Sequence, residues 1–146
     1  MGYEQGKHLE VFNRLYREMD HIYHGLAAKA GMSDSAFFIL YAIVELGEGC
    51  LQKDIAQYCS ISRQTINTSI QNLKKLGYLC MEEGKRREKR VYLTEEGERA
   101  VREKIYPVMD MEKAAFAEMP SEESRKLLEL TEKYVQIFRG KTGENM

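Results

Sequence analysis

A helical repeat with an unusual polar face constrains this fold more than any other segment. In ISRQTINTSIQNLKK (residues 61–75), Ile66, Ile70 and Leu73 recur at i, i+4 and i+7, the spacing of one buried stripe on an α-helix. The opposite face carries Arg, Gln, Thr, Asn and Ser but no acid, although Thr, Asn and Ser are mediocre helix formers. The segment predicts a helix that packs on one side and presents hydrogen-bonding groups on the other.

Short elements flank this helix in a definite order. We expect a short helix at about 52–58 before it and a turn at Ser60 and Ile61, with Ser62 as the N-cap of the polar helix. After Gly77, the sequences YLCM and RVYLT (78–81 and 90–94) have the character of strands, and EEGKRREK between them is a charged hairpin tip. Two helices joined by a tight turn and followed by a hairpin predict a winged helix-turn-helix.

Longer amphipathic helices are expected on both sides of this unit. The apolar spacing predicts helices over about 4–29 and 34–46, the second with Ser33 as N-cap. Thr94 is expected to cap a fifth helix that runs to about residue 118 with a bend near Pro107, and Ser121 to cap a sixth.

These elements predict a single domain, residues 1–146, of the mainly α class with a small β-hairpin wing (α+β) and six helices. Within it, residues 33–94 are expected to form the winged helix-turn-helix. Residues 1–32 and 95–140 are expected to form a helical dimerisation part of the obligate type.

Charge is distributed unevenly along the chain. The formal net charge is −1, yet residues 55–81 contain no Asp or Glu. Residues 62–93 contain eight Lys or Arg and three Asp or Glu, a net of +5, so the remainder carries −6. A basic region on an acidic body is the electrostatic pattern of a site for polyanions.

The polar helix carries the residue types that read base edges in the major groove of DNA: Arg for guanine, Asn or Gln for adenine, and the Thr methyl for thymine. An ordinary solvated helix face is the alternative, but the order of helix, turn and wing favours DNA. The predicted major-groove residues are Ser62, Arg63, Gln64, Thr65, Asn67, Thr68 and Gln71.

Cations concentrate in the predicted wing, where a hairpin tip can reach an adjacent minor groove. A merely soluble loop is the alternative there. Two lysines at the end of the polar helix can contact phosphate or favour the helix dipole. The predicted wing and phosphate contacts are Lys74, Lys75, Lys85, Arg86, Arg87, Lys89 and Arg90.

The sequences DIAQYCSISRQTINTSIQNLKKLGYL and KRREKRVYLTEEG together resemble the MarR family of winged-helix transcriptional regulators, over nearly the whole chain. The resemblance implies a ligand-responsive repressor that binds a roughly palindromic operator on double-stranded DNA as a homodimer. The family's wing pattern, Asp-x-Arg-Asp, falls on residues 85–88, so Arg87 matches the minor-groove arginine and Glu88 replaces the second acid. The first acid is Lys85 here, a departure from the pattern.

The resemblance also implies a ligand crevice and a dimer interface built from the terminal helices. Apolar stripes near both ends support the dimer, although they could instead pack only on each other. Aromatic residues at helical spacing could equally be core. Dimer contacts are expected at Leu9, Phe12, Leu127, Val135 and Phe138, and crevice residues at Tyr16, Tyr23, Phe37, Phe38, Tyr41 and Met109.

Other classes of site have weaker support. His21 and His24 have a metal-compatible spacing, but no third ligand is nearby in the sequence. The three cysteines are not paired as CxxC, so the cysteines are expected to be reduced and structural, with a redox sensor as the alternative.

We expect no cofactor and no enzyme activity, since no phosphate loop or nucleophile–base pair is present. The longest apolar run has nine residues, so we expect a cytoplasmic protein. A protein-interaction module with a basic face for an acidic partner is the alternative function.

Overall fold

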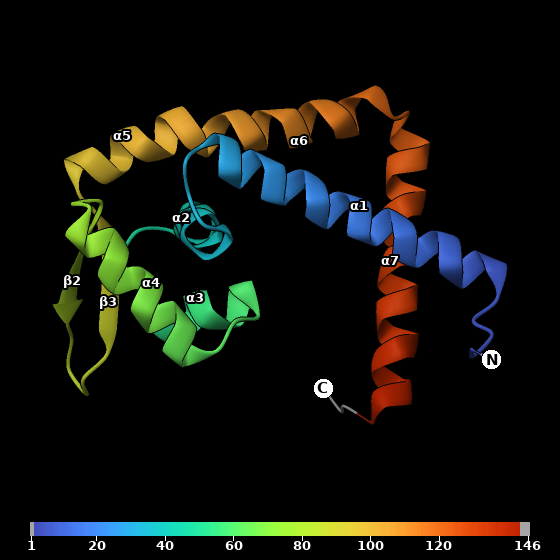
Figure 1. The fold of residues 1–146 in the computed structure, drawn as a ribbon, viewed down its shortest axis with the longest axis horizontal. Helices are drawn as coiled ribbons and strands as arrows, with labels where there is room; N and C mark the ends of the chain where they lie inside the picture. Colours follow the sequence, from blue (N-terminus) through green and yellow to red (C-terminus); the bar gives the residue numbers. More distant parts are fainter. Residues whose placement is uncertain (1, 144–146) are drawn as a thin grey trace. The chain divides into compact units, whose positions relative to one another are not determined.

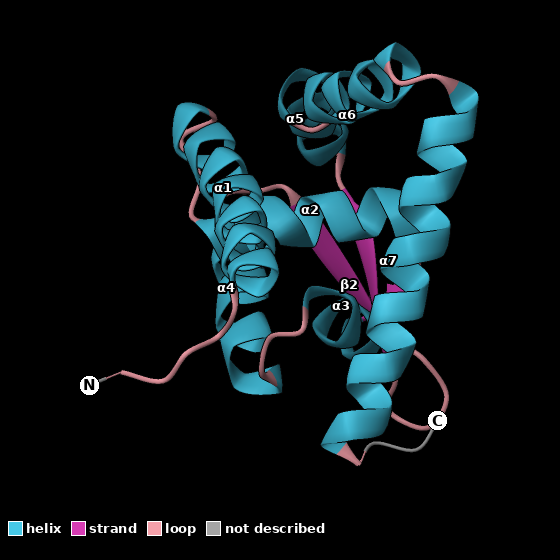
Figure 2. Cartoon of the chain, turned by 90° about the vertical axis from the view of Figure 1, so that its right-hand side faces the viewer, coloured by secondary structure: helices cyan, strands magenta, loops and turns pink. Residues whose placement is uncertain are grey.

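The helices expected around the polar segment are present in the computed structural model, which describes residues 2–143 (Figures 1 and 2). The mainly α fold class with a small β wing is confirmed. In chain order the elements are α1 (Lys7–Lys29), α2 (Asp34–Leu46), β1 (Cys50–Leu51), α3 (Gln52–Cys59), α4 (Arg63–Lys75), β2 (Leu79–Glu83), β3 (Lys89–Leu93), α5 (Glu95–Lys104), α6 (Tyr106–Glu118) and α7 (Ser121–Thr142).

Contacts divide the chain into two compact units, Met1–Pro107 and Val108–Met146. The first contains α1 to α5 and all three strands, and the second contains most of α6 and all of α7. The recognition surface described below lies wholly within the first unit.

Helix α2 is the centre of the first unit. Its side chains Phe37, Ile39, Leu40 and Ile43 are at most 1% exposed, and both α3 and α4 pack against it. Helix α4 contributes the stripe predicted from the sequence, because Ile66, Ile70 and Leu73 are also at most 1% exposed. Burying each such side chain stabilises the fold by about 1.5–3 kcal/mol.

A three-stranded antiparallel sheet with the order β1–β3–β2 carries the wing. Strands β2 and β3 pair from Leu79 opposite Leu93 to Glu83 opposite Lys89. The short strand β1 pairs Leu51 with Arg90 and was not predicted, since two residues show no alternation. Its pairing places the first turn of α3 beside the wing.

Three N-caps predicted from the sequence are confirmed. The hydroxyl oxygens of Ser33, Ser62 and Thr94 accept hydrogen bonds from the backbone amides three residues later, at 3.2, 3.2 and 3.0 Å. Each bond satisfies one of the free amides of a helix start. The boundaries of α2, α4 and α5 are therefore set locally.

The prediction was wrong at three helix boundaries. The helix expected over 95–118 with a bend near Pro107 is instead divided at Ile105, because Pro107 has no backbone N–H to continue the helical hydrogen bonds but is tolerated in the first turn of α6. Ser121 does not cap α7; Pro120 is the N-cap residue and makes no side-chain bond. Helix α1 begins after Gly6, at φ 90°, rather than at residue 4.

Gly97 holds α5 against the base of the wing. A Cβ atom at this position would lie 2.0 Å from the Tyr78 carbonyl oxygen and 2.9 Å from its carbon. The same carbonyl accepts a hydrogen bond from the Thr94 amide at 3.0 Å, so it cannot move freely. Only glycine permits this approach of two backbones.

We expect Gly97→Ala to destabilise the protein by about 1–3 kcal/mol or more, because the added methyl overlaps backbone atoms. Chemical denaturation followed by circular dichroism measures the change. Gly140→Ala is the matched control, because its Cβ meets nothing within 4 Å and alanine favours a helix by up to about 1 kcal/mol. Equal stability of the two variants would contradict the assigned contact.

Candidate nucleic-acid interface

Helix α4 presents its predicted polar face to solvent. Ile66, Ile70 and Leu73 are buried on the other face, together with Ser69, whose hydroxyl lies 2.8 Å from that of Ser35 on α2. This bond adds a polar link to the apolar packing of α4 on α2. All seven predicted major-groove residues are exposed: Ser62, Arg63, Gln64, Thr65, Asn67, Thr68 and Gln71.

The hydroxyl groups on this face are engaged within the helix. The Ser62 hydroxyl donates to Thr65 Oγ1 at 2.9 Å, and the Thr68 hydroxyl donates to the Gln64 carbonyl at 3.1 Å. Ser62 and Thr65 are thus primarily capping residues. Arg63, Gln64 and Gln71 make no side-chain hydrogen bond to the described residues, so their donors and acceptors are available to a ligand.

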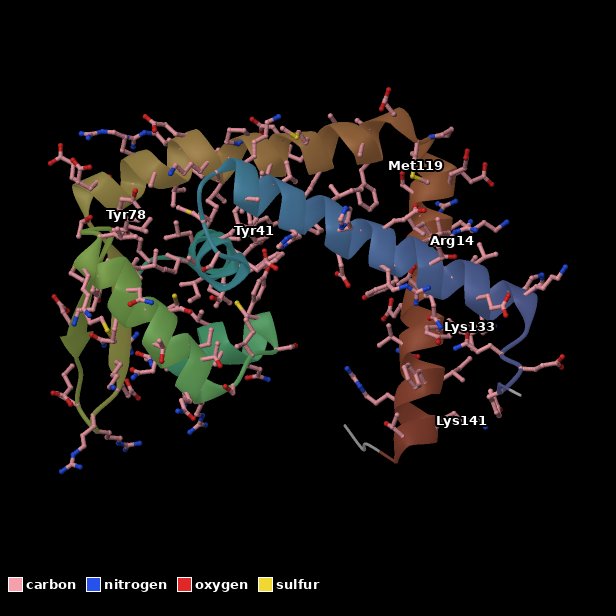
Figure 3. All side chains as sticks on the ribbon, viewed as in Figure 1. Arg14, Tyr41, Tyr78, Met119, Lys133 and Lys141 are labelled. Carbon is pink, nitrogen blue, oxygen red and sulfur yellow. The ribbon has the colours of Figure 1, made fainter. Side chains whose placement is uncertain are left out.

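The wing projects its cations at the tip of the β2–β3 hairpin, where Figure 3 shows nitrogen-tipped side chains. Arg86 and Arg87 both have positive φ, 75° and 61°, a conformation that costs a non-glycine residue about 1–2 kcal/mol. Local strain of this kind is found most often at functional sites. All five predicted wing cations are exposed: Lys85, Arg86, Arg87, Lys89 and Arg90.

Two arginines of the wing have different environments. Arg90 donates to the Gly49 carbonyl at 3.0 Å and to Glu88 Oε2 at 3.4 Å, which ties β3 to the segment before β1. Arg87 makes no ion pair or hydrogen bond within residues 2–143. The acid that replaces the second Asp of the family pattern thus pairs with Arg90 rather than with Arg87.

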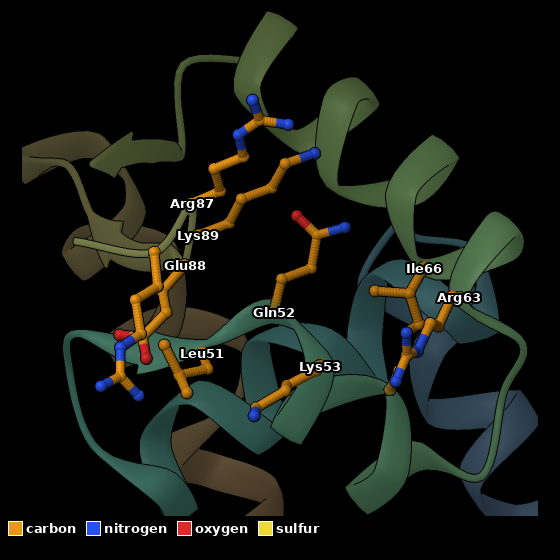
Figure 4. A pocket seen from close by; sticks show the side chains of 10 residues that line it. Leu51, Gln52, Lys53, Arg63, Ile66, Arg87, Glu88 and Lys89 are labelled. Atoms are coloured by element: carbon orange, nitrogen blue, oxygen red, sulfur yellow. The ribbon is translucent and has the colours of Figure 1, made fainter. Parts of the chain in front are cut away.

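A cleft of about 380 Å³ lies between the wing, the start of α3 and the start of α4 (Figure 4). Five of the residues that line it are cationic, and its one acid, Glu88, is paired with Arg90. Such a cleft suits an anionic group. Its lining residues are Leu51, Gln52, Lys53, Ala56, Arg63, Ile66, Arg86, Arg87, Glu88 and Lys89.

Gln52 and Lys53 were missed at the sequence level. They belong to the first turn of α3, and only the pairing of β1 with β3 brings them to the cleft. Lys53 could have been noticed as a cation on the outer face of a short helix. Nothing in the sequence marks Gln52.

Lys74 and Lys75 lie in the last turn of α4 and are exposed. Basic residues there interact favourably with the helix dipole, and phosphate contact stays a prediction.

Four of the predicted crevice aromatics contact one another in the first unit. The Phe38 ring centroid lies 5.6 Å from that of Tyr23, 5.4 Å from Phe37 and 6.4 Å from Tyr41, which connects α1 to α2. Tyr16 is 56% exposed and lies outside this group; its ring centroid is 6.0 Å from that of Phe12. Met109 belongs to the second unit. The ligand crevice stays a prediction.

The terminal helices each carry exposed apolar side chains. On α1, Leu15, Met19 and Ile22 are 49–61% exposed, while the predicted contacts Leu9 and Phe12 are half-buried. On α7 the exposed apolar residues include three predicted dimer contacts and are Leu127, Leu128, Leu130, Tyr134, Val135, Ile137 and Phe138.

His24 has a protein partner rather than a metal. Its Nδ1 atom lies 2.8 Å from Asp34 Oδ1, and both side chains are more than half exposed. Within residues 2–143 no group of three or more His, Cys, Asp or Glu side chains could hold a metal ion.

No single helix among the described residues is long and apolar enough to cross a membrane; only α1 and α2 taken together, bent by 95°, meet the criteria of length and composition.

The polar helix, the turn before it and the basic hairpin after it define a winged helix-turn-helix protein. Residues 30–88 match the model of the MarR family. This match and the shared fold make the chain similar to winged-helix proteins of the MarR family. No curated protein matches the chain.

Solved structures of MarR regulators share the fold. NMB1585, a MarR family regulator from Neisseria meningitidis, has 18% identity and a TM-score of 0.81 over 97% of this chain and 100% of its own. MepR of Staphylococcus aureus in complex with DNA has 16% identity and a TM-score of 0.75 over 93% and 99%. A MarR transcriptional regulator from Methanosarcina mazei has 20% identity and a TM-score of 0.66 over 87% and 92%.

The cysteines differ in accessibility, which bears on the redox alternative. Cys80 on β2 is exposed, whereas Cys59 is half-buried and its thiol lies 3.6 Å from the Phe38 carbonyl oxygen, to which it donates. Burial raises the pKa of the Cys59 thiol to about 11. Burial also raises the pKa of Cys50.

We expect iodoacetamide at pH 8 to alkylate Cys80 readily in the native protein and Cys59 only slowly. With a pKa of about 11, only about one Cys59 thiol in a thousand is the reactive thiolate at pH 8, and the fraction rises tenfold per pH unit toward pH 11. Mass spectrometry of timed samples measures each site, with urea-unfolded protein as the control. Rapid native alkylation of Cys59 would contradict its burial and revive a redox role.

Proposed function

We propose that this protein is a sequence-specific transcriptional regulator of the cytoplasm that binds a pseudo-palindromic operator on double-stranded DNA as a homodimer. The observation that carries the proposal is the exposed face of α4, where Arg63, Gln64 and Asn67 lie beside a cation-lined cleft. The residue types on this face match those that distinguish base pairs in the major groove.

The positions of α4 and the wing support separate roles for them in contacting DNA. The major groove is about 12 Å wide and admits one α-helix, which in helix-turn-helix proteins contacts bases through its N-terminal residues. Arg63, Gln64 and Asn67 all lie in the first two turns of α4. The wing, whose tip carries Arg86 and Arg87, is then free to meet phosphates or the adjacent minor groove.

Electrostatics supports the same surface. Counterion release makes cation–phosphate contact a strong, sequence-independent source of affinity, and carboxylates on the contact face would oppose it. The acid-free stretch 55–81 spans most of α3, all of α4 and the start of β2. The MepR–DNA complex has the same fold, which supports DNA rather than an enzyme substrate as the ligand.

A homodimer would give the exposed apolar residues of α1 and α7 a partner surface. Scattered exposed apolar residues are normal, but Leu127, Leu128, Leu130, Val135 and Ile137 on one helix are 43–58% exposed. Two copies would present two recognition helices, as a palindromic site requires. A small lipophilic or phenolic effector that releases repression would fit the aromatic group on α1 and α2.

Fluorescence anisotropy tests DNA binding, using duplexes selected from a random pool by the wild-type protein and a scrambled duplex, each at several salt concentrations. We expect tight binding to the selected duplex with a steep salt slope. Arg87→Ala should weaken binding to both duplexes, because it removes an unpaired cation. The slope of the logarithm of the binding constant against the logarithm of salt concentration should fall by about one for each wing that contacts DNA.

Lys133→Ala on α7 is the control, because this exposed lysine lies outside the proposed surface. Equal, weak binding to all duplexes would refute sequence-specific regulation and favour a basic surface for an acidic protein partner.

Light scattering tests the oligomer. Because the chain has a mass of 17.0 kDa, we expect one species near 34 kDa at micromolar concentration. Leu128→Glu should shift the mass toward the monomer, because it places a charge among exposed apolar residues of α7. Leu46→Glu is the control, since Leu46 is 42% exposed but lies at the end of α2. A wild-type monomer would refute the two-half-site arrangement.

A further inference from the structure

Gln52, the first residue of α3, connects the wing side of the cleft to the recognition helix. Its Nε2 atom donates a hydrogen bond to Asn67 Oδ1 at 3.3 Å. Its Oε1 atom is buried and has no hydrogen-bond partner among the described residues. Figure 4 shows the Gln52 amide between Lys89 of the wing and α4. Gln52 is therefore half-buried, with its amide oxygen enclosed and its amide nitrogen bonded to the recognition helix.

The contact bears on how an asparagine reads a base. Bidentate recognition of adenine by Asn needs the oxygen to accept from N6 and the amide nitrogen to donate to N7. The terminal amide torsion is broad and roughly two-fold, so a free Asn can present either its oxygen or its nitrogen in a given direction. An Asn that rotates freely pays an ordering cost on binding and discriminates less between bases.

The Gln52 donor couples the two amides. With Gln52 Nε2 beside Oδ1, the Asn67 oxygen faces α3, and Asn67 cannot reverse alone because that would bring two N–H groups together. The Asn67 oxygen keeps one lone pair, and its nitrogen keeps both hydrogens. The acceptor and donor that adenine requires thus remain available, in a set orientation.

Among the residues on the outer face of α4, Asn67 is the one whose terminal amide is held by another element. Gln64 and Gln71 have no side-chain hydrogen bond to residues 2–143. The strand β1, which directly precedes α3, pairs with β3 of the wing. Gln52 therefore orients Asn67 relative to the same sheet that positions the wing.

We propose that Gln52 is a positioning residue for base recognition by Asn67, so that sequence preference at one base pair depends on α3 as well as on α4. The inference rests on the proposed function. It predicts that loss of Gln52 relaxes that preference without weakening the phosphate contacts, since Gln52 carries no charge.

Duplexes selected by the wild-type protein provide the test. One half-site is varied to all four base pairs at each position, and affinities are measured for wild type, Gln52→Ala, Asn67→Ala and the double variant. We expect Asn67→Ala to abolish a preference of about 5- to 150-fold at one position. Gln52→Ala should reduce the same preference severalfold and no other, and add nothing to Asn67→Ala.

Two further variants separate positioning from a structural role. Gln52→Glu keeps the shape of the side chain but can only accept, so it favours the reversed amide of Asn67 and should also remove the preference. Gln57→Ala, at an exposed position of the same helix, should leave every preference unchanged. In the free protein, the side-chain amide resonances of Asn67 should shift in both Gln52 variants and not in Gln57→Ala.

The outcomes are distinguishable. If the wild-type protein selects no common sequence, the proposed function fails and this inference fails with it. If a sequence is selected but both Gln52 variants retain the wild-type preference at the Asn67 position, or if Asn67→Ala alters no position, the inference alone is overturned.

Discussion

The packing of α4 on α2 and α3 is the interaction on which the rest of the interface depends. Ile66, Ile70 and Leu73 are buried, and together they stabilise the fold by about 4.5–9 kcal/mol. The five mediocre helix formers of α4, namely Thr65, Asn67, Thr68, Ser69 and Asn72, cost at most about 0.7 kcal/mol each. Tertiary burial therefore outweighs local propensity, and the outer face is free to carry residues that suit a ligand rather than a helix.

The second constraint is the two-residue strand β1. By pairing Leu51 with Arg90, it places the start of α3 beside the wing, so that the two elements line the same cleft. The sequence made the hairpin predictable through its alternation and its charged tip, but pairing of a distant dipeptide leaves no local pattern. That is why Gln52 and Lys53, which reach the cleft only through this strand, could not be identified from the sequence.

What the sequence predicted well is what local chemistry determines. Ser33, Ser62 and Thr94 are caps because a short side-chain oxygen at a helix start satisfies a nearby amide, whatever lies around it. Ser121 has the same chemistry but sits one residue inside α7, where Pro120 takes the capping position. The break at Ile105 follows from Pro107 but lies two residues before it, because a helix boundary is set by several weak local preferences. The exposed polar face of α4 was predictable, whereas the bonds among its hydroxyls depend on rotamers that no pattern encodes.

The wing shows how one charge can determine the role of its neighbours. Glu88 lies within three residues of five cations, and its carboxylate pairs with Arg90, which also donates to the Gly49 carbonyl. Arg90 is thereby held along the sheet as a structural residue, and an exposed pair of this kind adds at most about 1 kcal/mol. Because the acid is occupied, Arg87 keeps its charge uncompensated at a strained position of the tip. A substitution of Glu88 would then act through Arg90 on the geometry of the wing, and a substitution of Arg87 on its charge.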